Sequence, residues 1–292
     1  MQIKPHEFMI KFTPHTRWVE GSGILIVVAF FLGGIGGGLY LTSLFFNNIL
    51  GMFVGWLLVC IVGLVDMLHL PKPFRFWRMF LNLNSSWIAR GFILIAFFII
   101  LAAVQLALFY WLQETVYEKS FRILSGLLTF GVIIYSGFVL SYVKAIRLWN
   151  SAMIPILFIT SSLAGGAAVF SIISLSRNIN LTNTLLHVLQ ITLVLYAIML
   201  ALHLWTSIYN SPSARKSVIW MLKGNISYIF WILVVLAGVV IPLFIFFLTG
   251  SDARVLLNIG AVFVILGNFT FKFIILKSGV YIPLAPSNEV ST

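Results

Sequence analysis

The chain has 292 residues, of which 61% are hydrophobic and only 9% are Asp, Glu, Lys or Arg. A soluble domain carries roughly 25% charged residues, so this composition excludes an ordinary soluble fold and predicts a protein embedded in a membrane. The formal net charge of +11 comes from loop residues that orient the chain, and it does not indicate nucleic-acid binding.

The apolar residues form long continuous runs. Backbone groups in hydrocarbon must satisfy their own hydrogen bonds, which leaves α-helices or a closed barrel. A helix needs about 20 residues to cross about 30 Å of hydrocarbon, whereas barrel strands are shorter and alternate in polarity. Each run is therefore predicted to be a transmembrane helix. The runs cover residues 21–46, 49–70, 87–112, 121–142, 152–175, 181–205, 225–248 and 253–276.

Aromatic residues and charges support these boundaries. The rings near the ends of the runs, which favour the headgroup level, belong to Trp18, Trp87, Trp111, Trp149, Trp205 and Tyr228. With eight spans both chain ends lie on one side, together with all Lys and Arg residues except Lys119, Arg122, Arg177 and Arg254. Because cytoplasmic loops are rich in Lys and Arg, the termini are expected to be cytoplasmic. If those charges dock a partner instead, the argument for this orientation weakens.

A short small-residue pattern recurs along the chain. Residues 32–38 read LGGIGGG and residues 161–168 read SSLAGGAA, and the second and sixth runs both end near Leu-His-Leu. An offset of about 130 residues with an even number of helices per unit predicts a parallel repeat. The expected fold class is an all-α integral membrane protein of about eight transmembrane helices, arranged as two four-helix bundles, 1–144 and 145–292.

The first predicted helix is unusually rich in glycine at positions 33–38. Small residues let helix backbones approach closely, which is the packing interpretation of this run. So many glycines also loosen a helix and leave room for a flat ligand. Gly34 is the candidate to line such a site.

Ionisable residues gather at the boundary shared by the first three runs. Asp66 and His69 lie one turn apart on one face at the end of the second run, Glu20 precedes the first run, and Arg90 opens the third. Ionisable groups near hydrocarbon are usually paired and often functional. Two interpretations stay open: a salt-bridge cluster that fixes the bundle, and a proton-handling site beside a redox ligand.

The sequence provides few ligands for a cofactor of its own. Cys60 is the single cysteine, so no iron–sulfur cluster or zinc site of the usual cysteine type is expected. Among the five histidines, only His69 and His203 could face each other from separate helices as a haem pair requires. We expect no metal, no haem and no iron–sulfur cluster in this chain.

A transporter or ion-translocating channel is an alternative class. Eight helices, a glycine-rich first helix and a repeat suit such a protein. Four polar residues inside the runs could line a proton path or form interhelical hydrogen bonds: Gln105, His187, Gln190 and Asn268. The presence of partner subunits would distinguish a transporter from a subunit of a larger complex, because a transporter should purify and function alone.

Six segments, in order along nearly the whole chain, form a recognisable set. They are FLGGIGGGLYL at 31–41, DMLHLPKPFRFWR at 66–78, SSWIARG at 85–91, YSGFVLS at 135–141, the stretch from Trp149 through PILF to GGA at 165–167, and the stretch from Lys272 through GVYIPL at 279–284. The set resembles the NrfD / polysulfide-reductase membrane-subunit family. The second segment departs from the family's DLGRP pattern at its centre, and Lys272 stands where the family has arginine.

The resemblance implies a haem-free membrane anchor of a multi-subunit oxidoreductase, with a quinone site in the first bundle. Tyr135 matches a tyrosine implied to donate to a quinone carbonyl, and Asp66 matches an acidic residue implied to exchange protons. Some relatives carry a histidine one turn before the glycines, where this chain has Ala29 or nearby apolar residues. Glu20, His69 or Arg90 are the candidates to substitute for it, with Gly34 beside them.

The implied partners are a four-cluster ferredoxin-like iron–sulfur subunit and a molybdopterin-type catalytic subunit, with menaquinone or ubiquinone as the quinone and membrane lipid around the helices. Basic residues at the same end are candidates for docking: Lys72, Arg75, Arg78 and Arg147. The expected function is electron exchange between a quinone pool and the iron–sulfur subunit in anaerobic respiration, in a bacterial or archaeal cytoplasmic (inner) membrane. Proton translocation, the substrate of the catalytic subunit and the direction of electron flow stay open.

Overall fold

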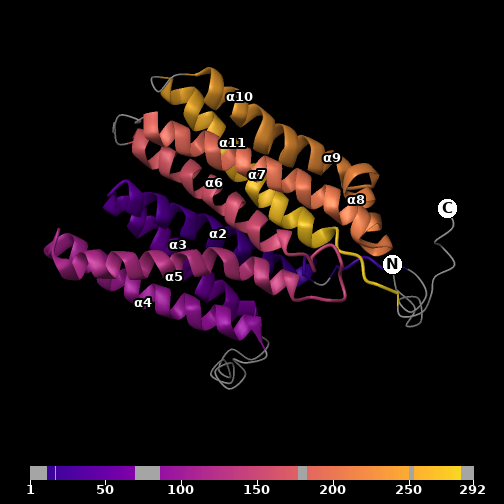
Figure 1. The fold of residues 1–292 in the computed structure, drawn as a ribbon, viewed down its shortest axis with the longest axis horizontal. Helices are drawn as coiled ribbons and strands as arrows, with labels where there is room; N and C mark the ends of the chain where they lie inside the picture. Colours follow the sequence, from indigo (N-terminus) through magenta and orange to yellow (C-terminus); the bar gives the residue numbers. More distant parts are fainter. Residues whose placement is uncertain (1–11, 17, 70–85, 177–182, 250–252, 284–292) are drawn as a thin grey trace.

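The computed structural model describes residues 12–16, 18–69, 86–176, 183–249 and 253–283, except for the side chains of residues 69, 175 and 176. Within these residues, 8 helices are long and apolar enough to cross a membrane, which confirms the predicted all-α membrane fold. Figure 1 shows two groups of helices side by side. The first group contains η1 (Gly21–Gly23), α2 (Ile24–Phe45), α3 (Ile49–His69), α4 (Trp87–Trp111) and α5 (Val116–Ser141). The second contains α6 (Met153–Ser176), α7 (Asn183–Asn210), α8 (Pro212–Lys223), a span built from α9 (Ser227–Ile229), η3 (Phe230–Val240) and α10 (Ile241–Leu248), and α11 (Arg254–Lys277).

Helix α2 lies at the centre of the fold because its glycines face several neighbours. It packs against α3, α5, α6 and α11. A Cβ atom at Gly36 would lie 2.9 Å from the Cβ of Leu58 in α3, and one at Gly37 would meet α5. At Gly38 a Cβ would overlap the carbonyl group of Ser162 in α6. Since only glycine permits such close approach, the structure supports the packing interpretation of the glycine run.

The two small-residue segments that suggested a repeat pack against each other. Gly34 of α2 faces Ser162 of α6, and Gly38 faces both Ser162 and Gly166. A contact that lies farther along α2 also lies farther along α6, so the two helices run in the same direction. One hydrophobic cluster includes residues of both helix groups. The internal repeat and the division near residue 144 stay predictions.

The seventh span departs from a regular α-helix. Its middle part, η3, has wider π-type turns. Pro242 follows in the first turn of α10, and in an α-helix a proline ring clashes with the carbonyl four residues before it. The wider turns relieve this clash. Gly238 of η3 packs against Gly267 of α11, so one face of this irregular segment lies against protein.

Local capping explains two differences from the predicted boundaries. Helix α5 begins at Val116 rather than near 121, because the Thr115 hydroxyl accepts a hydrogen bond from the Glu118 N–H at 3.3 Å. Helix α8 was not predicted. Ser211 caps it by accepting from the Ala214 N–H at 3.2 Å, and the helix is too short and polar to form an apolar run.

Three segments far apart in the sequence close one end of the molecule. The Tyr281 N–H donates to the Thr13 carbonyl at 2.9 Å, and the Tyr281 hydroxyl lies 2.5 Å from Nδ1 of His15. Trp149, in the loop between α5 and α6, is fully buried and donates from Nε1 to the Ile275 carbonyl at 2.7 Å. The first and last described segments therefore lie on the same side of the bundle, as an even number of spans requires.

Candidate functional site

An acidic and a phenolic side chain meet at one end of the first helix group. Asp66 stands in the last turn of α3, and Tyr135 lies less than two turns before the end of α5. The Tyr135 hydroxyl is within hydrogen-bonding reach of the Asp66 carboxyl group. Both residues are partly buried. A phenol donor beside a carboxyl group can hold a carbonyl oxygen and exchange a proton with it.

The start of α4 shapes the space around Tyr135. A Cβ atom at Gly91 would overlap the Tyr135 ring. Trp87 stacks on Phe138 of α5 with ring centroids 4.7 Å apart and planes 11° apart, and the Arg90 guanidinium carbon lies 4.8 Å from the Trp87 ring centroid. Gly91 and Trp87 were not predicted as site residues. Their position in the SSWIARG segment, next to Arg90, is the signal that could have identified them.

The other residues predicted at this site lie at different places around it. Glu20 is exposed directly before η1 and makes no side-chain cap hydrogen bond. Gly34 lies at the contact between the helix groups, against Ser162. His69 ends α3, and its side chain lies outside the described residues. The roles of these residues in ligand binding stay predictions.

The residues predicted to dock a partner are only partly described. Arg147 is exposed in the loop that joins α5 to α6, at the same end of the bundle as the Asp66–Tyr135 pair. Lys72, Arg75 and Arg78 lie outside the described residues.

A buried hydrogen-bond network crosses the other end of the first helix group. The Tyr40 hydroxyl donates to Gln105 Oε1 at 2.9 Å, and Gln105 Nε2 lies 3.4 Å from Glu118 Oε1. The side chains of Tyr40 and Gln105 are 0% exposed and that of Glu118 is 2% exposed. The network links α2, α4 and α5 in apolar surroundings, where an unpaired polar group is costly. The contacts of Gln105 are therefore interhelical hydrogen bonds.

Replacing Gln105 by leucine should lower the free energy of unfolding by about 1–3 kcal/mol, because the Tyr40 hydroxyl and the Glu118 carboxyl group lose a buried partner. Tyr40→Phe alone should cost about 1 kcal/mol, and less in the Gln105→Leu background, where the hydrogen bond is already gone. Denaturation in mixed detergent, followed by circular dichroism, measures both values. If Tyr40→Phe costs the same in both backgrounds, the hydrogen bond carries no stability.

His187 and Gln190 belong to the second helix group. His187 is exposed, and its Nδ1 lies 3.1 Å from Gln190 Oε1. Gln190 Nε2 donates to the Phe246 carbonyl at 2.6 Å, one of the carbonyls that a helix end leaves without an internal partner. This bond ties α7 to α10. Because Gln105 lies in the first group and Asn268 contacts the Ser161 carbonyl of α6, the residues predicted for a proton path do not all lie together.

A lysine is fully enclosed where α2, α6 and α11 meet. The Lys272 side chain is 0% exposed, its Nζ donates to Ser161 Oγ at 2.9 Å, and Nζ lies 3.7 Å from the Phe158 ring centroid. Asn268 donates to the Ser161 carbonyl. Among the described residues, Oδ1 of Asn268 and the Ser162 hydroxyl are buried without a hydrogen-bond partner. Lys272 was counted among the charges that orient the chain, and its burial removes it from that argument.

The variant Lys272→Met should unfold at the wild-type temperature or about 2–4 °C higher, a shift that corresponds to about 1 kcal/mol in a chain of this size. Methionine keeps the length of the side chain and removes a desolvated amine. Lys272→Ala, which leaves a cavity, should cost about 2–5 kcal/mol. Thermal unfolding in detergent compares the two. A loss in Lys272→Met as large as in Lys272→Ala would mean that the amine itself stabilises the fold.

Fold and site together define a multi-pass α-helical membrane protein with a carboxyl–phenol pair at one end of its first helix group. In the part of the chain that the structure describes, no group of three or more His, Cys, Asp or Glu residues is placed to hold a metal ion. Residues 21–284 match the family described as "Polysulphide reductase, NrfD". The chain belongs to this family, as the resemblance predicted.

Two relatives are similar to the chain over most of its length. Protein NrfD of Escherichia coli (strain K12) is 24% identical over 212 residues, covering 63% of this chain and 67% of the relative. The C chain of polysulfide reductase from Wolinella succinogenes is 24% identical over 240 residues, covering 72% of this chain and 74% of the relative.

Proposed function

We propose that the chain is the membrane anchor subunit of a respiratory oxidoreductase and exchanges electrons between a quinone pool and a docked iron–sulfur subunit. Membership of the NrfD family supports a membrane subunit of a redox complex. The Wolinella relative is named as one lettered chain of a polysulfide reductase, which supports further subunits, here an iron–sulfur subunit and a molybdopterin-type catalytic subunit. The cytoplasmic membrane of a bacterium or archaeon is the proposed location.

The observation that carries the proposal is the Asp66–Tyr135 pair. Conversion of a quinone to a quinol takes up two electrons and two protons, and the electrons would come from the iron–sulfur subunit. The Tyr135 hydroxyl can donate to a carbonyl oxygen, and Asp66 can supply or accept the proton at the same place. The pair stands at a membrane boundary on partly buried residues.

The aromatic side chains beside the pair suit a flat headgroup. Trp87 and Phe138 stack next to Tyr135, and Gly91 leaves the Tyr135 ring its space. Sites for small organic ligands are mostly apolar and aromatic, with few polar groups that fix orientation. Menaquinone and ubiquinone both meet this description.

Purification in a mild detergent, followed by mass spectrometry of proteins and of extracted lipids, tests the proposal. Recovery of an iron–sulfur subunit together with menaquinone or ubiquinone is the expected result. Recovery of the chain alone, folded and free of quinone, would contradict it and favour a transporter or ion-translocating channel.

A further inference from the structure

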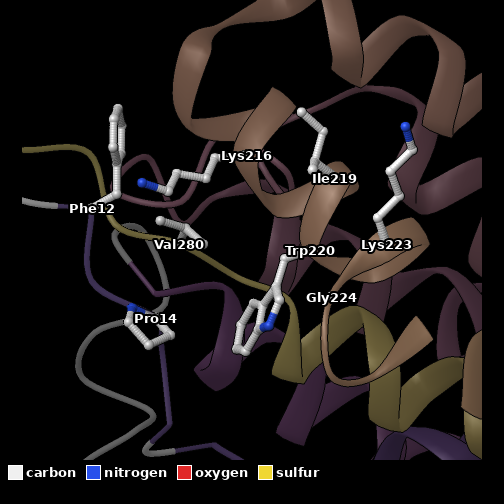
Figure 2. A pocket seen from close by; sticks show the side chains of 8 residues that line it. All are labelled: Phe12, Pro14, Lys216, Ile219, Trp220, Lys223, Gly224 and Val280. Carbon is white, nitrogen blue, oxygen red and sulfur yellow. The ribbon is translucent and has the colours of Figure 1, made fainter. Parts of the chain in front are cut away.

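A cavity of about 360 Å³ lies between helix α8 and the two described ends of the chain. Figure 2 shows the Lys216 side chain reaching toward Phe12 and Val280, with Ile219, Trp220 and Lys223 farther along α8. The cavity lies outside the first helix group, and none of the predicted site residues lines it. Its wall is mainly apolar, and the two lysines provide its charges.

One face of α8 carries the cavity residues in a regular spacing. Lys216, Ile219, Trp220 and Lys223 recur at the three- and four-residue intervals of a single helix face. The opposite face, which includes Ala214 and Val218, is buried against the bundle. The outward face thus has a cation at each end and apolar side chains between them. A helix of this pattern suits the boundary between headgroups and acyl chains.

The position of α8 agrees with that boundary. The preceding span ends at Asn210, and the next begins at Ser227. Exposed aromatic side chains flank both spans at this level, with Tyr209 73% and Trp231 50% exposed. Tyr and Trp side chains favour the headgroup layer, so the cavity opens in that layer.

The charges around the cavity favour an anion. Lys216 and Lys223 are both exposed, and none of the described residues that line the cavity is acidic. Residues 119–251, which include helix α8, contain no Asp or Glu. The Lys216 amine lies 4.8 Å from the Phe12 ring centroid, at the apolar wall.

We propose that this cavity binds one anionic phospholipid. Lys216 and Lys223, one at each end of the cavity, attract the phosphate of its headgroup, and its glycerol and upper acyl region packs on Phe12, Ile219 and Trp220. A lipid fits better than an acidic segment of a soluble protein, because the apolar wall and the cations meet at the membrane boundary itself. The proposal is independent of the quinone reaction and holds whatever the complex oxidises or reduces.

Native mass spectrometry of the detergent-purified chain tests the proposal by titration with phosphatidylglycerol and with phosphatidylcholine of the same acyl chains. The double variant Lys216→Gln/Lys223→Gln should bind phosphatidylglycerol about 30-fold more weakly, which corresponds to about 1 kcal/mol for each lysine near a lipid phosphate. Both lysines are exposed, so the variant should fold, and circular dichroism checks this.

The control Lys119→Gln/Lys144→Gln removes the same charge at two exposed positions outside the cavity, and it should bind phosphatidylglycerol as the wild type does. Equal losses in both double variants would overturn the proposal, because binding would then depend on total charge alone. A wild type without preference for phosphatidylglycerol would overturn it too. Loss of a soluble partner rather than of lipid from the Lys216/Lys223 variant would make this face a protein interface instead.

Discussion

Gly38→Ala is expected to lower the free energy of unfolding by about 2–3 kcal/mol, although alanine favours a helix. The added Cβ would overlap the carbonyl group of Ser162, and a helix backbone cannot rotate out of the way as a side chain can. Overpacking of a tight interior typically costs 1–3 kcal/mol. The midpoint of unfolding in a series of denaturing detergent mixtures measures the loss.

Gly63→Ala in α3 is the matched control. A Cβ there would lie 3.8 Å from Cδ1 of Ile99, an ordinary contact, and alanine is about 1 kcal/mol better than glycine in a helix interior. This variant should therefore be as stable as the wild type or more stable. If Gly38→Ala were equally stable, the close contact between α2 and α6 would not hold the two helix groups together.

Asp66→Asn is expected to reduce quinone-linked turnover of the complex by about 10²–10⁴-fold, the usual contribution of a positioned acid or base. Asparagine keeps the size and a hydrogen-bonding oxygen but cannot exchange the proton. Tyr135→Phe, which removes one donor to a charged or polarised oxygen, should cost about 10- to 100-fold. Both effects rest on the proposed function and are measured as quinol or quinone turnover by purified complex.

Tyr142→Phe provides the control for the loss of a phenol. Tyr142 caps the end of α5 and is 56% exposed, so its hydroxyl should not affect turnover. Quinone content and recovery of the partner subunits are measured in every variant, which separates loss of chemistry from loss of assembly. Turnover near the wild-type value in Asp66→Asn, with quinone and partners retained, would remove Asp66 from the reaction.

The amino-acid sequence alone determined the membrane class, the number of spans and most of their boundaries. Hydrocarbon imposes these features locally: each span must be about 20 apolar residues long and must satisfy its own backbone hydrogen bonds. The glycine run in α2 and the acidic residue near the end of α3 could also be identified from the sequence, because each is a local pattern. Proximity of Asp66 to Tyr135 followed from the family resemblance, and the structure places the two side chains together.

The tertiary structure decided the features that depend on distant partners. The cavity beside α8 needs Phe12 and Val280, which are far apart in the sequence. Lys272 looks like an ordinary charge near a helix end, yet three helices enclose it, and Gln105 looks like an isolated polar residue until Tyr40 and Glu118 meet it. A lipid bilayer dictates the composition of each span but not which faces pack together, because lipid tails are as apolar as the helix surfaces. Small residues and a few hydrogen bonds make that choice.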